Sequence, residues 1–338
     1  MEILRKMTLG LVLCALLPAP SPACLWDRDT LASESARFPE VASIMTGLFP
    51  RHSQEYHTWR VQQTKRLIDS GSGTAAASEY DDLAVSQHKL GDHRAAIATM
   101  LDKERHLPGK YETYSNLGTF YIYTGELLTA IKWIDKALAI NANAHFGREK
   151  YQRYLVLWLV ERSRMASVRK GKPNDLEPAD PTSLKGFAAF VARQEMGNPP
   201  AATPLRLTEH QRRAAIRGVT GMMYFADFDN PILQEALGDL LSFGEMDTDA
   251  AQLAALCYLQ AAQKTSDAEE TARLKTLMTH ALSRTLKEGR GELQQTLTKA
   301  LAQGVAVNAD VRNDELAWIE AGKDLSKEFQ KKYLPTRK

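Results

Sequence analysis

The chain has 338 residues, of which 44% are hydrophobic and 25% are charged, and its formal net charge is +2. This composition is typical of a globular protein and excludes disordered and collagen-like chains. A net charge this close to zero gives no reason to expect nucleic acid or an anionic membrane surface as a partner. The length allows about two domains.

The first 23 residues have the pattern of a secretory signal peptide. Arg5 and Lys6 form a short basic start, an apolar run continues from residue 9 to 17, and Ser21 and Ala23 supply the small residues of a cleavage site. The run is too short to cross a bilayer as a helix. We therefore expect an exported protein, periplasmic or extracellular, with an uncleaved N-terminal anchor as the alternative.

Three cysteines bear on the fate of the exported chain: Cys14, Cys24 and Cys257. Cys14 would leave with the signal peptide, and Cys24 would become the first mature residue. One hypothesis is lipidation of Cys24, the only membrane contact we expect, although Ser21 stands where lipoprotein signals normally have leucine. A second is a Cys24–Cys257 disulfide, because exported proteins meet an oxidising compartment. The third is that Cys257 is a small buried hydrophobic residue.

Residues 24–76 are predicted to be an irregular segment followed by a capping helix. Ser53 can cap the start of this helix, and Tyr56 and Trp59 follow at helical spacing. A Ser-Gly-Ser-Gly run at 70–73 ends it. We expect the helix to cover one end of the region that follows.

Residues 77–144 contain two consecutive units of 34 residues in the same register. Residues of the same kind recur at six matching positions of the two units. In the first unit these are Tyr80, Leu83, Ala84, Gly91, Ala96 and Met100, and in the second they are Tyr114, Leu117, Gly118, Gly125, Ala130 and Ile134. Pro108 in the first unit, and Tyr121 and Ala137 in the second, belong to the same pattern. The pattern resembles the tetratricopeptide repeat, with one repeat at 77–110 and another at 111–144. Gln87, Lys103 and Ala142 depart from it.

The resemblance implies paired helices that stack, with the first helix of each repeat lining a concave groove. Carried over position by position, the groove would contain Asp81, Val85, His88 and Lys89 from the first repeat and Ser115, Thr119, Ile122 and Tyr123 from the second. A groove of this kind suits a peptide or a partner helix. The family's carboxylate clamp uses Lys and Asn, but the corresponding positions here hold Asp81, Val85, Ser115 and Thr119, so capture of chaperone tails is not expected. The alternative is that Ile122 and Tyr123 simply pack on the next helix.

The remaining chain is also predicted to be helical. We expect a closing helix at 145–168, a Pro-rich linker at 169–206 and a helical, tetratricopeptide-like region at 207–338. Within that last region Thr208 and Asn230 are predicted helix caps, Ser266 and Glu269 a capping box, and 291–303 and 312–332 the final helices. No strand pattern is present. The predicted fold class is therefore all-α, a solenoid of helical hairpins followed by a second helical region.

No motif for catalysis or for a cofactor accompanies this architecture. The phosphate-binding loop, HExxH, CxxC and GxSxG are all absent. His88 and His93 lack a third metal ligand, and the acidic pairs at 27/29 and 227/229 lack EF-hand spacing.

We therefore expect a non-catalytic scaffold without cofactor or metal, which binds a protein or peptide partner. The alternatives are an envelope enzyme, a carbohydrate-type hydrolase or lyase that would need paired carboxylates in a cleft, and an assembly factor with no specific ligand. The partner and the oligomeric state stay open.

Overall fold

The computed structural model describes residues 25–35, 39–70, 77–142, 147–171, 186–200, 202–244, 248–283 and 290–334. In these ranges it contains fifteen helices and no strand, so the prediction of an all-α fold is confirmed there. The predicted signal peptide, Cys14 and Cys24 lie outside the described residues. None of the helices in the described ranges combines the length and the apolar character that crossing a membrane requires.

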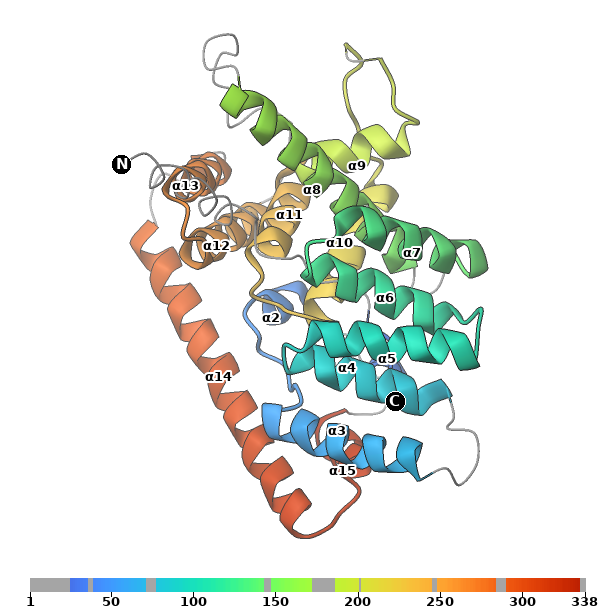
Figure 1. The fold of residues 1–338 in the computed structure, drawn as a ribbon. Coiled ribbons are helices and arrows are strands. Elements are labelled where there is room, and N and C mark those ends of the chain that lie inside the picture. The colour runs from blue at the N-terminus through green and yellow to red at the C-terminus, as the bar shows by residue number, and fades with distance from the viewer. Residues whose placement is uncertain are drawn as a thin grey trace, which may run out of the picture.

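Four helices in the middle of the chain form two consecutive hairpins. They are α4 (Ala77–Lys89), α5 (His93–His106), α6 (Tyr111–Tyr123) and α7 (Leu127–Ile140), and they lie side by side in chain order (Figure 1). Each bound of α6 and α7 falls 34 residues after the corresponding bound of α4 and α5. Gly91 and Gly125 make the two turns with φ of +86° and +79°, a conformation that favours glycine. The sequence period thus corresponds to a repeated helical unit.

Small residues allow the helices of each hairpin to approach closely. Ala84, Ala96 and Ala130 are fully buried. A Cβ atom on Gly118 of α6 would lie 2.6 Å from Cγ1 of Ile134 on α7, closer than carbon atoms can pack. The positions that carry the sequence pattern are therefore the positions where two backbones meet.

The N-terminal part places one helix on the first hairpin and another in the main core. α3 (Gln54–Asp69) packs on α4, and its predicted cap is confirmed, because the Ser53 side chain accepts a hydrogen bond from the Tyr56 amide. Before it come α1 (Arg28–Ser35) and α2 (Val41–Met45), whose Ile44 and Met45 lie in the main core.

The main hydrophobic core lies among the helices that follow the hairpins. α8 (Arg148–Gly171) packs on α7 and on α10 (Glu209–Phe225). α9 (Phe187–Glu195) lies within the predicted Pro-rich linker, yet it is buried in this core with α11 (Pro231–Ser242), α12 (Thr248–Lys264) and α13 (Ala268–Ser283). The predicted caps Thr208 and Asn230 are confirmed.

Two local predictions in the C-terminal region are wrong. Asp267, one residue after Ser266, accepts the hydrogen bond from the Glu270 amide that caps α13. The chain then ends in the 31-residue α14 (Arg290–Glu320) and in α15 (Leu325–Tyr333), instead of breaking near Gly304. Gly304 permits a close approach between two backbone segments of the chain: a Cβ there would lie 2.8 Å from the carbonyl oxygens of Thr46 and Gly47. α14 runs along one side of the molecule from α12 to α3 (Figure 1).

We predict that Gly118→Ala destabilises the protein. Alanine in a helix interior is normally better than glycine by about 1 kcal/mol. Here the added methyl group collides with Ile134, and overpacking of this kind costs about 1–3 kcal/mol. Urea unfolding should show a lower midpoint with an unchanged slope. A higher midpoint would show that α6 and α7 are not in close contact.

Candidate functional site

The first described residues of the chain lie across the two hairpins. We call residues 25–30 the N-terminal strap. Leu25 is fully buried in a cluster with residues of α4, α5 and α6. At the next residue, the Asn116 side chain of α6 accepts a hydrogen bond from the Trp26 amide at 2.9 Å and donates one to the Trp26 carbonyl, also at 2.9 Å. The strap is thus held through its backbone by a side chain 90 residues away.

A buried arginine on α3 holds the rest of the strap. Nη1 of Arg60 donates to Oδ2 of Asp27 at 2.7 Å and to Oδ2 of Asp29 at 2.8 Å, and Nη2 donates to Asp82 of α4. Burial opposes the charge on this guanidinium, but the carboxylates around it raise the pKa of Arg60 well above its ordinary value. Asp82 also accepts a hydrogen bond from the backbone amide of Arg28 at 3.1 Å.

The strap is also linked to the end of the chain. The Tyr56 hydroxyl donates to Asp29, and the Ser326 hydroxyl of α15 donates to the same carboxylate at 3.3 Å. Nearby, Nδ1 of His52 lies 2.6 Å from Oε1 of Glu315 on α14, and the His52 ring packs on Phe329 at 3.9 Å between centroids. Burial would raise the pKa of Asp29, but Arg60 and then His52 lower it well below its ordinary range.

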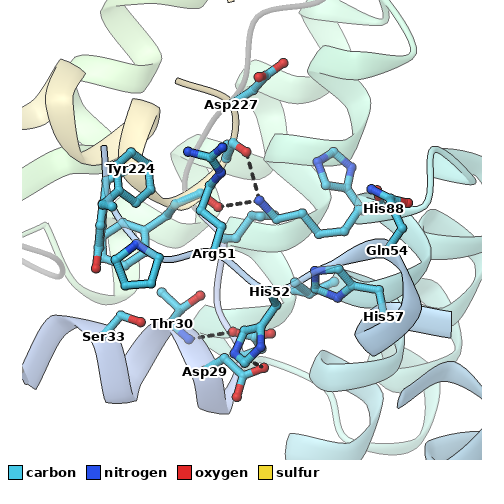
Figure 2. Close-up of a pocket in the computed structure, with 18 of the residues that line it drawn as sticks. Asp29, Thr30, Ser33, Arg51, His52, Gln54, His57, His88, Tyr224 and Asp227 are labelled. Atoms are coloured by element: carbon cyan, nitrogen blue, oxygen red, sulfur yellow. Dashed lines mark hydrogen bonds and ion pairs between the residues drawn. The ribbon is translucent and has the colours of Figure 1, made fainter. Parts of the chain in front are cut away.

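A pocket with a volume of about 420 Å³ opens beside the strap. Four of the eight predicted groove residues line it: Val85, His88, Lys89 and Tyr123. The loop before α3, the end of α10 and α15 complete its wall. Asp227 and Asp29 lie at opposite ends of the view in Figure 2, with Arg51 and His52 between them.

The other four predicted groove residues lie in contacts between helices. Asp81 accepts two 2.7 Å hydrogen bonds from Nζ of Lys103 on α5, which explains the lysine that departs from the repeat pattern. Ser115 and Thr119 face the side chains of Glu149 and Gln152 on α8. Ile122 packs in a small apolar cluster with residues of α7 and α8. α8 therefore covers much of this side of the second hairpin.

Two histidines of the pocket form a neutral pair. Nδ1 of His88 and Nδ1 of His93 are 3.0 Å apart, and the His88 ring packs against Phe120 and Tyr123. Burial, and then the neighbouring His93 and Lys89 charges, place the pKa of His88 well below its ordinary value. At neutral pH both rings are therefore uncharged, and Nδ1 of one imidazole accepts a hydrogen bond from the Nδ1–H of the other. No set of three or more potential metal ligands occurs in the described ranges.

The pKa values of two pocket residues, Lys89 and Asp227, are shifted toward neutral pH. Nζ of Lys89 donates to the carbonyl oxygens of Phe225 at 2.7 Å and Ala226 at 2.8 Å, at the end of α10. Burial lowers the pKa of Lys89 to about 8. Burial, together with a hydrogen bond to Asp229, raises the pKa of Asp227 to about 7.

Sequence reasoning missed most of this site. It identified Lys89 and His88 as exposed groove residues, treated residues 24–52 as irregular, and considered Asp27 and Asp29 only as calcium ligands. The informative signal was the pair of carboxylates Asp27 and Asp29 next to the apolar Leu25 and Trp26, because acidic side chains that are buried with apolar neighbours need cationic partners. Cys257, the third cysteine, is fully buried in α12, in the main core.

Comparison with known proteins gives no family assignment. No protein-family model matches the chain, and no curated protein matches it. The function must therefore be inferred from the residues and their contacts.

We predict that Asp227→Asn stabilises the protein increasingly as the pH rises from about 4 to about 7. An unfolded aspartate releases its proton near pH 3.9, whereas folded Asp227 keeps its proton until about pH 7. Folding therefore binds a proton in this window, and the stability of the natural protein falls as the pH rises. Asparagine has no such proton and can still donate to Asp229. Thermal unfolding of both proteins at pH 4 to 8 measures the difference; a difference that does not change with pH contradicts the titration.

Proposed function

We propose that the chain is a tetratricopeptide-type binding module whose α4 and α6 hold an extended segment of a partner protein. The 34-residue periodicity of the helix bounds supports the family resemblance. The observation that carries the proposal is the paired hydrogen bonding of Asn116 to both backbone groups of Trp26. A side-chain amide that bonds to both the N–H and the C=O of one residue recognises the backbone and not the side chain. It can therefore hold any extended segment whose side chains fit the surrounding surface.

The contacts of the strap support a particular set of side chains for such a segment. An apolar residue fills the place of Leu25, an aromatic ring packs edge-on against Tyr111 at 5.4 Å as Trp26 does, and carboxylates pair with Arg60. A partner segment with this order of apolar, aromatic and acidic residues would compete with the strap for the same contacts. Such competition would make partner binding depend on release of the strap.

The proposed place of action is outside the cytoplasm. The basic start, apolar run and small residues of the first 23 positions support export. Mass spectrometry of the mature N-terminus in a secreting host tests this proposal, and it also distinguishes a lipidated Cys24 from a free one. A mature chain that begins at Met1 would contradict export by cleavage.

A carbohydrate-type enzyme is the second candidate, because Asp227 and Asp229 are neighbouring carboxyl groups and Asp227 lines the pocket. Glycosidases separate their two carboxyl groups by about 5–9.5 Å to leave room for the sugar or a water. Asp227 and Asp229 instead hydrogen bond directly to each other. Their contact supports binding over this type of hydrolysis.

The binding proposal predicts that a peptide with the sequence of residues 25–35 binds in trans once the strap is weakened. We expect the full chain with Leu25→Ala and Trp26→Ala to bind the fluorescently labelled peptide saturably, and the natural chain to bind it much more weakly because its own strap occupies the site. Fluorescence anisotropy measures both.

Two matched controls make the experiment specific. Adding Asn116→Ala should reduce peptide affinity, because the paired backbone hydrogen bonds are lost. A peptide with asparagine at the positions of Asp27 and Asp29 should also bind less tightly, because Arg60 loses two of its three carboxylate partners. The proposal fails if the weakened chain does not bind the peptide, or if Asn116→Ala leaves the affinity unchanged.

A further inference from the structure

Two cations of the pocket differ in their partners from Arg60, Lys103 and Arg273. Lys103, Arg60 and Arg273 each contact at least one carboxylate at 2.8 Å or less. Lys89 donates only to two carbonyl oxygens, and Arg51 donates to the carbonyl oxygen of Gly47 at 3.1 Å. In the described part of the chain, neither Lys89 nor Arg51 forms an ion pair with a carboxylate.

These two charges are costly where they lie. Burial lowers the pKa of Lys89, and the carboxylates of Asp227 and Asp27 offset this effect only in part. Burial also lowers the pKa of Arg51. A charge withdrawn from water is tolerated when an opposite charge compensates it. An ammonium has three donors, and the two carbonyl groups use two of those of Lys89, so one donor is available to a ligand.

The groups around the two cations indicate the kind of anion that fits. Phe49 and Phe228 pack on the guanidinium of Arg51, with its carbon 4.9 and 4.4 Å from their ring centroids. Tyr123 and Phe225 add aromatic surface to the wall. A planar guanidinium matches a carboxylate, and an apolar body suits aromatic walls.

The acidic groups of the same pocket limit the charge of the ligand. Asp27 and Asp29 line the pocket on the strap side, and Asp227 lines it near the end of α10. The first two are neutralised by Arg60 only in part, because that guanidinium also binds Asp82. These carboxylates would repel a dianion such as phosphate more strongly than a singly charged group. Imidazoles of His52, His57, His88 and His93 also line the wall and can form hydrogen bonds with neutral parts of the ligand.

We propose that this pocket binds a small monocarboxylate with an apolar or aromatic body, whose carboxylate is held by Lys89 and Arg51. Lys89 and Arg51 make none of the contacts of Asn116, so the site goes beyond the binding function proposed above, although the strap residues Leu25, Asp27 and Asp29 also line the pocket. A pocket of about 420 Å³ is within the size range of small-molecule sites.

Benzoate is the probe that tests the proposal. We expect saturable binding of benzoate to the full chain at pH 7, measured by calorimetry and by the rise in melting temperature. Benzamide, which has the same shape without the charge, should bind at least about tenfold more weakly, because hydrogen bonds to a charged group are the stronger ones. Equal affinities for benzoate and benzamide, no binding of benzoate, or tighter binding of inorganic phosphate than of benzoate would each overturn the proposal.

Two lysine variants separate ligand binding from folding. Lys89→Met removes the ammonium that we propose holds the carboxylate, and it should lose benzoate binding. Lys103→Met should melt at a lower temperature, because Asp81 loses its partner, and should still bind benzoate. A Lys89→Met protein that binds benzoate normally would contradict the assignment. Arg51→Gln, which should weaken benzoate binding, provides the same test if Lys89→Met does not fold.

Discussion

The arrangement of this molecule depends on the buried guanidinium of Arg60. A charge in this position is stable only when it is paired, and its three carboxylate partners come from two other segments, the N-terminal strap and α4. Removing one partner of a buried ion pair typically costs about 3–5 kcal/mol. The strap must therefore lie where Asp27 and Asp29 reach Arg60, and this placement brings Leu25 and Trp26 onto the hairpins. Through Asp29 the same network reaches Tyr56 and Ser326, so it links both ends of the described chain.

Local periodicity explains which parts of the fold could be predicted. The hairpins were predictable because close helix contact requires small residues such as Gly118 and Ala130 at fixed intervals, and these intervals are visible in the sequence. Caps such as Ser53 and Thr208 were predictable for the same reason, since a cap acts within three residues. The predicted gap between helices at 291–303 and 312–332 was wrong because Gly304, which lies in it, contacts Thr46 and Gly47, and these residues are distant in sequence. A glycine that ends a helix and a glycine that admits another backbone look alike in the sequence.

The site was less predictable than the fold because its contacts span long sequence separations. The partner of Trp26 is Asn116, and that of His52 is Glu315. The resemblance to a repeat family indicated which residues form the helical hairpins but gave no information on what covers them. Two hairpins alone leave apolar surface unburied, and here the strap and α8 cover it. As a result, Asp81, Ser115, Thr119 and Ile122 lie inside helix contacts, while His88 and Lys89 meet residues that no local pattern connects to them.

Amide hydrogen exchange in the strap tests the central claim most directly. The amides of Trp26, Arg28 and Thr30 donate to side-chain oxygens of Asn116 at 2.9 Å, Asp82 at 3.1 Å and Asp27 at 2.8 Å. Amides with such partners in a stable structure exchange only when that structure opens. The account predicts that these three amides exchange about as slowly as the amides of α3. Exchange at the rate of an unstructured peptide, with α3 still protected, would show that Arg60 does not hold the strap on the hairpins.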